Sequence, residues 1–177
     1  MKKLYCCEKK CSIYYFAISF SLIILLFVWN ISLTVFVSND KPAHISSFNY
    51  APENLPDGGY ITFDTNRVIE KNDITHEEGS SDFIINKTGN YYVQFNTNIY
   101  EPPSTGKETT LSVYLEHNNA TIYGTTVGET VSNAYQTVNL SFGVIIKANH
   151  GDILRIKNNS GTVVELLQPN VDIIRIK

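Results

Sequence analysis

Alternation of apolar and polar residues dominates the second two thirds of the chain and limits the folds that it can adopt. The clearest run is residues 138–146, where Val138, Leu140, Phe142, Val144 and Ile146 fall on one face of an extended strand. Similar short runs, separated by turn residues, continue to the C-terminus, and none shows a helical period of 3.6 residues. About eight to ten short strands must bury their apolar faces on one another. The pattern predicts an all-β, two-sheet sandwich of the jelly-roll or immunoglobulin-like type.

Residues 83–99, FIINKTGNYYVQFNTNI, are typical of a β-hairpin, because two alternating runs flank a turn that contains glycine. In the second run one face is apolar and is expected in the core: Tyr91, Val93, Phe95 and Ile99. The opposite face is mixed: Tyr92, Gln94, Asn96 and Asn98. Such a mixed face can meet solvent or a neighbouring subunit.

The cysteines all lie at the beginning of the chain, at Cys6, Cys7 and Cys11. A domain that follows them must therefore be stabilised by packing and hydrogen bonds without disulfides. The three thiols beside an apolar segment are consistent with reduced cytosolic thiols, with palmitoylation, or with a weak metal site.

Residues 12–37 contain no charged side chain and would form a helix of about 39 Å, enough to cross a membrane with some tilt. Four lysines precede the segment, so the positive-inside rule predicts a cytoplasmic tail over residues 1–11 and an extracellular C-terminal domain. We expect a single-pass signal anchor. The alternative is a cleaved signal peptide, whose apolar region is normally shorter.

Residues 38–57 contain Pro42, Pro52 and Pro56 among polar residues and show no sustained alternation. This composition predicts a stalk or linker between the membrane segment and a folded domain at residues 58–177.

Landmark residues in this domain resemble the C1q globular-head family. The first half carries an early phenylalanine, a glycine, and the pattern F-x-[apolar]-x-x-x-G-x-Y-x-[apolar]; the second half carries a long apolar strand, a Gly-Asp turn and a terminal apolar strand. The residues that match are Phe63, Gly79, Phe83, Ile85, Gly89, Tyr91, Val93, Gly151 and Asp152. The chain is most similar to the cysteine-free bacterial versions, the BclA-type C-terminal domains of collagen-like spore-surface glycoproteins.

This resemblance implies a jelly roll of about ten strands that assembles as a homotrimer. The related tumour necrosis factor (TNF) family has the same fold and a type II membrane layout like the one predicted here. Two features depart from the family pattern: no collagen stalk precedes the domain, and the last strand carries isoleucines at Ile173, Ile174 and Ile176 where aromatic residues are usual.

Pairs of consecutive apolar residues favour an interface between subunits. Ile153 with Leu154, and Ile173 with Ile174, cannot all point into one core, so some of them must face outward. We expect Ile153, Ile173 and Tyr92 to contribute to the subunit interface. The alternative is that loops of the same subunit cover these strands.

The sequence shows no pattern that is typical of a catalytic site. The histidines, His44, His76, His117 and His150, lie in separate segments, and no nucleophile elbow, phosphate loop or zinc-protease motif is present. The best candidate metal site is a weak calcium site formed by Asp73, Glu77 and Glu78, and no other cofactor is expected. The formal net charge of −3 gives no reason to expect a nucleic-acid partner.

The sequence therefore predicts a non-catalytic, membrane-anchored, trimer-forming module displayed outside the cell for protein or glycan recognition. Two alternatives remain open: a structural component of a spore or cell-envelope surface layer, and a metal-dependent lectin or enzyme that uses the domain loops.

Overall fold

A computed structural model describes residues 19–26, 42–102, 108–133 and 135–176. By its contacts the chain divides into two compact units, residues Met1–Lys41 and Pro42–Lys177. All strands of the described residues lie in the second unit.

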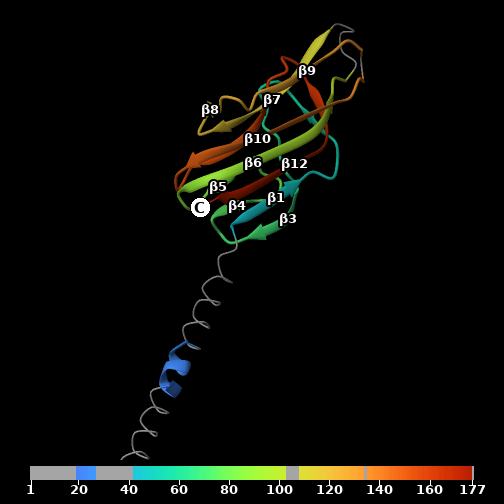
Figure 1. The fold of residues 1–177 in the computed structure, drawn as a ribbon. Coiled ribbons are helices and arrows are strands. Elements are labelled where there is room, and N and C mark those ends of the chain that lie inside the picture. Colours follow the sequence, from blue (N-terminus) through green and yellow to red (C-terminus); the bar gives the residue numbers. More distant parts are fainter. Residues whose placement is uncertain (1–18, 27–41, 103–107, 134, 177) are drawn as a thin grey trace, which may run out of the picture. The chain divides into compact units, whose positions relative to one another are not determined.

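The second unit is a sandwich of two antiparallel sheets, each with six strands (Figure 1). In sheet A the strand order is β10-β6-β12-β1-β3, and β2 also pairs with β12. In sheet B the order is β4-β5-β11-β7-β8, and β9 also pairs with β7. The strands are β1 (His44–Phe48), β2 (Glu53–Leu55), β3 (Thr65–Glu70), β4 (Ile74–His76), β5 (Phe83–Ile85), β6 (Gly89–Tyr100), β7 (Thr109–His117), β8 (Ala120–Thr121), β9 (Val127–Val131), β10 (Val138–Ala148), β11 (Ile153–Asn158) and β12 (Val164–Ile176). The predicted all-β jelly-roll class is confirmed, with twelve strands in the described part of the chain.

The core lies between the sheets and follows the predicted alternation. Tyr91, Val93, Phe95 and Ile99 of β6 are each 0% exposed, as expected from their shared face. Phe95 packs against Phe142 of β10, with 5.5 Å between ring centroids. Burial of each such side chain contributes about 1.5–3 kcal/mol, so this face stabilises the sandwich strongly.

The predicted hairpin over residues 83–99 is wrong. β5 pairs with β4 and β11 in sheet B, whereas β6 pairs with β10 and β12 in sheet A, so the short connection between them crosses from one sheet to the other. The alternation gives the buried face of each strand but does not say which sheet the strand joins.

The predicted stalk over residues 38–57 is also corrected. β1 pairs with both β12 and β3, and β2 pairs with β12, so the folded unit begins at Pro42 and not at Gly58. β1 has the sequence HISSF, and its two serines break the alternation of apolar residues by which a strand is recognised in a sequence. Ile45 and Ser47 are nevertheless fully buried.

The last strand is long and continuous. β12 runs from Val164 to Ile176, and a bulge between Leu167 and Asn170 shifts its register against β6. Gln168 lies in this bulge with a φ of 50°, a left-handed conformation that is unusual for a residue with a side chain. At this bulge the alternation of buried and more exposed residues along β12 is interrupted.

In the N-terminal unit, residues 19–26 are helical. Among the described residues there is no helix long and apolar enough to cross a membrane. The predicted cytoplasmic tail with its cysteines, and most of the predicted anchor over residues 12–37, lie outside the described residues.

Candidate binding surface

The residues that carry the family resemblance form the framework on which the outer surfaces are built. Phe63 and Phe83 are buried and meet edge to face, with 5.4 Å between ring centroids. Gly79 has a φ of 84°, and its N–H donates to the carbonyl of Phe63 at 2.7 Å, so a left-handed residue closes this loop. The hydroxyl of Tyr91 donates to the carbonyl of Lys87.

The Gly-Asp turn joins two loops at one end of the sandwich. Asp152 Oδ2 accepts from the backbone N–H of Asn149 at 2.7 Å and from His117 Nε2 at 2.7 Å, and Oδ1 accepts from Asn118 Nδ2 at 2.8 Å. Because these donors favour the carboxylate, above all the Asn149 N–H, the pKa of Asp152 is lowered. Gly151 has a φ of 89° at the same turn. These contacts give both residues a structural role.

An apolar row crosses the outer face of sheet A. Ile145 of β10 lies opposite Tyr92 of β6, Tyr92 lies opposite Ile174 of β12, and Ile174 lies opposite His44 of β1. Ile145 is 64% exposed. Beside this row, a Cβ on Gly143 would come within 2.8 Å of the Tyr92 hydroxyl, so the glycine leaves room for the tyrosine ring. We call Ile145, Tyr92 and Ile174 the sheet A row; His44 at its end is polar and pairs with Asp172.

The three predicted interface residues lie in three different places. Tyr92 is on the outer face of sheet A, as expected from its mixed face. Ile153 is half-buried on the outer face of sheet B, opposite Ile84 of β5. The prediction for Ile173 is wrong: it is 1% exposed in the core of its own subunit, because its neighbour Ile174 is the residue that points outward.

The acidic residues of the predicted calcium site do not converge. The carboxylate of Asp73 pairs with Arg175 of β12 at 3.2 Å, and Glu78 Oε1 accepts the backbone N–H of Asn66 at 3.1 Å. In the described parts of the chain no group of three or more His, Cys, Asp or Glu side chains is arranged to hold a metal ion. The geometry therefore gives no support to the Asp73, Glu77 and Glu78 site.

Three of the histidine side chains are also engaged separately. His44 Nε2 is 3.3 Å from Asp172, and His117 pairs with Asp152. His76 stacks on Phe83 with 4.3 Å between ring centroids, and its Nε2 donates to the carbonyl of Ser80 at 3.0 Å. Burial lowers the pKa of His76, which favours the neutral ring. These contacts stabilise the fold and assemble no catalytic group.

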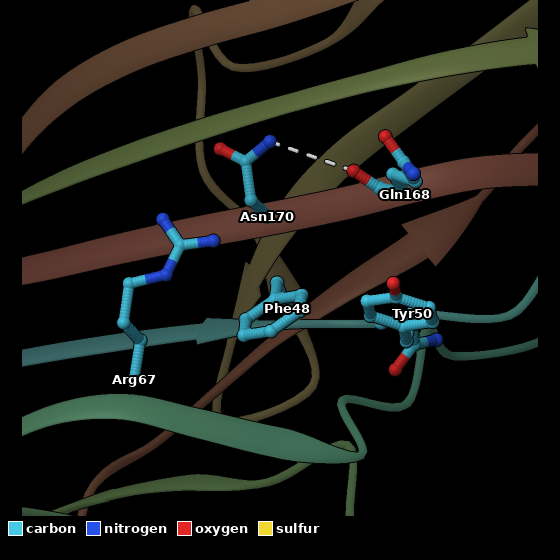
Figure 2. Close-up of a pocket in the computed structure, with 6 residues that line it drawn as sticks. Phe48, Tyr50, Arg67, Gln168 and Asn170 are labelled. Atoms are coloured by element: carbon cyan, nitrogen blue, oxygen red, sulfur yellow. Dashed lines mark hydrogen bonds between the residues drawn. The ribbon is translucent and has the colours of Figure 1, made fainter.

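A hollow of about 340 Å³ lies at the end of β1, a volume in the range of small-molecule sites. Its lining comes from β1 and the residues after it, from β3 and from the bulge of β12: Phe48, Asn49, Tyr50, Arg67, Gln168 and Asn170. Figure 2 shows Arg67 beside Phe48 with its guanidinium toward Asn170, and the side chains of Asn170 and Gln168 above Phe48 and Tyr50. We call it the β1-end hollow.

The side chains of the hollow retain unused hydrogen-bonding capacity. The Arg67 guanidinium lies 4.6 Å from the centroid of the Phe48 ring and pairs with no carboxylate among the residues that the structure describes. Asn170 makes one long hydrogen bond, from Nδ2 to the Gln168 carbonyl at 3.5 Å. Tyr50 is 79% exposed. Sequence reasoning missed this site because its residues are far apart in the chain and form no local pattern.

Beneath the hollow, Asn49 fixes the chain after β1. Its N–H donates to the carbonyl of Pro169 at 3.0 Å, its Nδ2 donates to Glu53 Oε2 at 3.0 Å, and its Oδ1 accepts the Asp64 N–H at 2.7 Å. Burial raises the pKa of Glu53, in part against the hydrogen bonds that it accepts from Thr62 and Asn49. The floor of the hollow is therefore a fixed polar network.

Comparison with solved structures identifies the fold. The globular domain of the zebrafish complement 1qA protein matches with a TM-score of 0.56 at 14% identity, covering 76% of this chain and 98% of that domain. Murine APRIL at pH 5.0 matches with a TM-score of 0.56 at 11% identity, covering 77% of this chain and 100% of that one. The structure of murine APRIL at pH 8.0 gives a TM-score of 0.55 at 10% identity, with coverages of 77% and 100%.

No family model and no curated protein matches the sequence. The solved structures establish a C1q/TNF-like jelly roll, and the finer similarity to BclA-type domains stays a prediction.

Proposed function

We propose that the chain is a non-catalytic recognition module that assembles as a homotrimer through the outer face of sheet A and is displayed outside the cell by a membrane anchor at residues 12–37. The observation that carries the proposal is the sheet A row, an apolar strip on the outside of a sandwich whose core is already complete. Isolated exposed apolar residues are common, but a row that continues across neighbouring strands is typical of an interface.

The flanking rows of the same face support this choice. Next to the apolar row, Gln94 of β6 lies opposite Gly143 on one side and Asp172 on the other. One row further, Asn96 of β6 lies opposite Ser141 of β10. Of the side chains beside the strip, Gln94, Gly143, Ser141 and Asn96 are small or uncharged, which suits a subunit interface, while Asp172 and Lys147 are charged and would have to stay in contact with water.

The outer face of sheet B is less suitable. Ile153 and Ile84 form an apolar pair there, but Arg155 follows on the same face of β11 and is held by Asp82 at 2.6 Å. Burial of that ion pair would carry a desolvation cost. We therefore place the interface on sheet A, with Tyr92, and not on sheet B, with Ile153.

Display outside the cell rests on the sequence alone. The uncharged run of residues 12–37, its preceding lysines and the absence of cysteine from residues 42–177 support a single-pass, N-terminus-inside arrangement. Protease digestion of intact cells that express the chain with a C-terminal epitope tests this part: loss of the epitope supports it, and protection would contradict it.

Assembly is tested with two matched variants of exposed isoleucines on opposite sheets. Ile145→Asp places a charge in the sheet A row, and Ile84→Asp places the same charge on the outer face of sheet B, where Ile84 is 40% exposed. Sedimentation velocity of the full-length protein should show dissociation for Ile145→Asp and the wild-type size for Ile84→Asp. The opposite pattern would move the interface to sheet B, and no effect of either variant would refute the proposal.

A further inference from the structure

We propose that the β1-end hollow binds a sugar that carries a carboxylate, such as a uronic acid unit of a glycan. The inference deepens the proposed recognition function, since it names a ligand class, but it does not depend on trimer assembly.

The cation of the hollow is available and held in place. Arg67 stacks on Phe48 at 4.6 Å and has no carboxylate partner within the described residues. A guanidinium that stacks on a ring keeps the N–H groups at its edge available, and two of them match the two oxygens of a carboxylate. Arg67 therefore offers a bidentate anion site at the edge of the hollow.

The amides provide the complementary groups for hydroxyls. Gln168 and Asn170 each carry a carbonyl acceptor and an NH₂ donor, and their side chains border the same hollow (Figure 2). Sugar hydroxyls act as both donors and acceptors, so side-chain amides satisfy them well. The exposed ring of Tyr50 adds a flat apolar surface against which the C–H face of a sugar ring can pack.

The hollow is preorganised. The buried Asn49 fixes the chain between Phe48 and Tyr50 through its contacts with Pro169, Glu53 and Asp64. Gln168 adopts a φ of 50° within a bulge of β12, a conformation that costs free energy for a residue with a side chain and that is often retained at binding sites. A fixed site loses less conformational entropy on binding.

The surroundings favour one carboxylate over a polyanion or a peptide. Asp64 lies close by, with Oδ2 3.4 Å from the backbone nitrogen of Tyr50, and Glu53 bonds to Asn49 below. These acidic groups would repel a ligand with many negative charges. β1 is hydrogen-bonded on both sides, to β12 and β3, so at Phe48 a peptide finds no free strand edge.

Titration of the full-length protein with glucuronic acid, with glucose as the uncharged analogue, tests the inference at constant ionic strength. Saturation-transfer NMR should show binding of glucuronic acid in the millimolar range that is typical of a small, shallow site, and at least tenfold weaker binding of glucose. Arg67→Gln should reduce the affinity for glucuronic acid to that for glucose. Tyr50→Ala should weaken the binding of both sugars at least tenfold.

Two exposed residues outside the hollow provide matched controls. Lys147→Gln removes a cation from β10, and Tyr123→Ala removes a tyrosine that is 98% exposed; neither should change binding. Equal binding of both sugars, or no effect of Arg67→Gln, would overturn the inference. Tighter binding of an acidic peptide than of glucuronic acid would also overturn it, in favour of a protein ligand.

Sedimentation of the same samples separates this inference from the proposed assembly. Arg67→Gln should leave the wild-type size unchanged. If it dissociates the assembly and the wild type binds no sugar, the hollow is a subunit contact and the inference fails. If the wild type is monomeric but still binds glucuronic acid, the inference about the hollow is supported and the proposed trimer is refuted.

Discussion

Substitution of Asp152 should destabilise the domain more than its position at a surface turn suggests. The carboxylate accepts three hydrogen bonds, from Asn149, Asn118 and His117, and its side chain is only 14% exposed. A hydrogen bond to a charged group contributes about 1.5–3 kcal/mol, and bonds that share one carboxylate are not additive. We expect Asp152→Ala to lower the free energy of unfolding by about 3 kcal/mol, and Asp152→Asn by about half of that.

Urea unfolding followed by circular dichroism measures this effect. Asp172→Ala is the matched control, because the Asp172 side chain is 38% exposed and its carboxylate lies 3.3 Å from His44 Nε2, so its loss should cost under about 1 kcal/mol. Since the pKa of Asp152 is lowered on folding, its contribution is present above the unfolded pKa near 3.8 and is lost as the pH falls through the folded value. Equal stabilities of Asp152→Ala and Asp172→Ala at pH 7 would refute the reasoning.

Two further predictions concern the core. Burial lowers the pKa of His76 below 6.5, so the unfolded chain binds the proton more readily than the folded chain. The free energy of unfolding should therefore fall as the pH drops below about 6.5, by at most about 1.4 kcal/mol per pH unit. Urea unfolding at pH 7.0 and 5.5 should show that His76→Gln removes this part of the pH dependence, and an unchanged pH dependence would contradict the assignment. Phe95→Ala should lower the free energy of unfolding by about 3–5 kcal/mol, because the ring is 0% exposed and packs on Phe142. Tyr123→Ala, at a fully exposed position, should change it by less than about 0.5 kcal/mol, and a similar loss in both variants would count against the core assignment.

The alternation predicted the faces of the strands well, because its period of two is a local property of the extended chain. Tyr91, Val93, Phe95 and Ile99 are all buried as expected. The partner of each strand is not a local property. The three residues between β5 and β6 could have closed a hairpin, but they connect opposite sheets instead.

The two surfaces were predictable to different degrees. The outward position of Tyr92 followed from the alternation of β6, whereas Ile173 and Ile174 are adjacent, and only the register of β12 decides which of them points outward. The β1-end hollow gave no sequence signal at all. Arg67 and Gln168 are about a hundred positions apart and meet only because β1 lies between β3 and β12.

The measurement that tests the central claim most directly is the solution mass of the fragment Pro42–Lys177 by static light scattering over a range of concentrations. The fragment must begin at Pro42, since a start at Gly58 would remove β1 and β2 from sheet A. Assembly through the sheet A row predicts three times the mass of one copy. The mass of a single copy at all concentrations would contradict it, and the row would then be an exposed surface without a subunit partner.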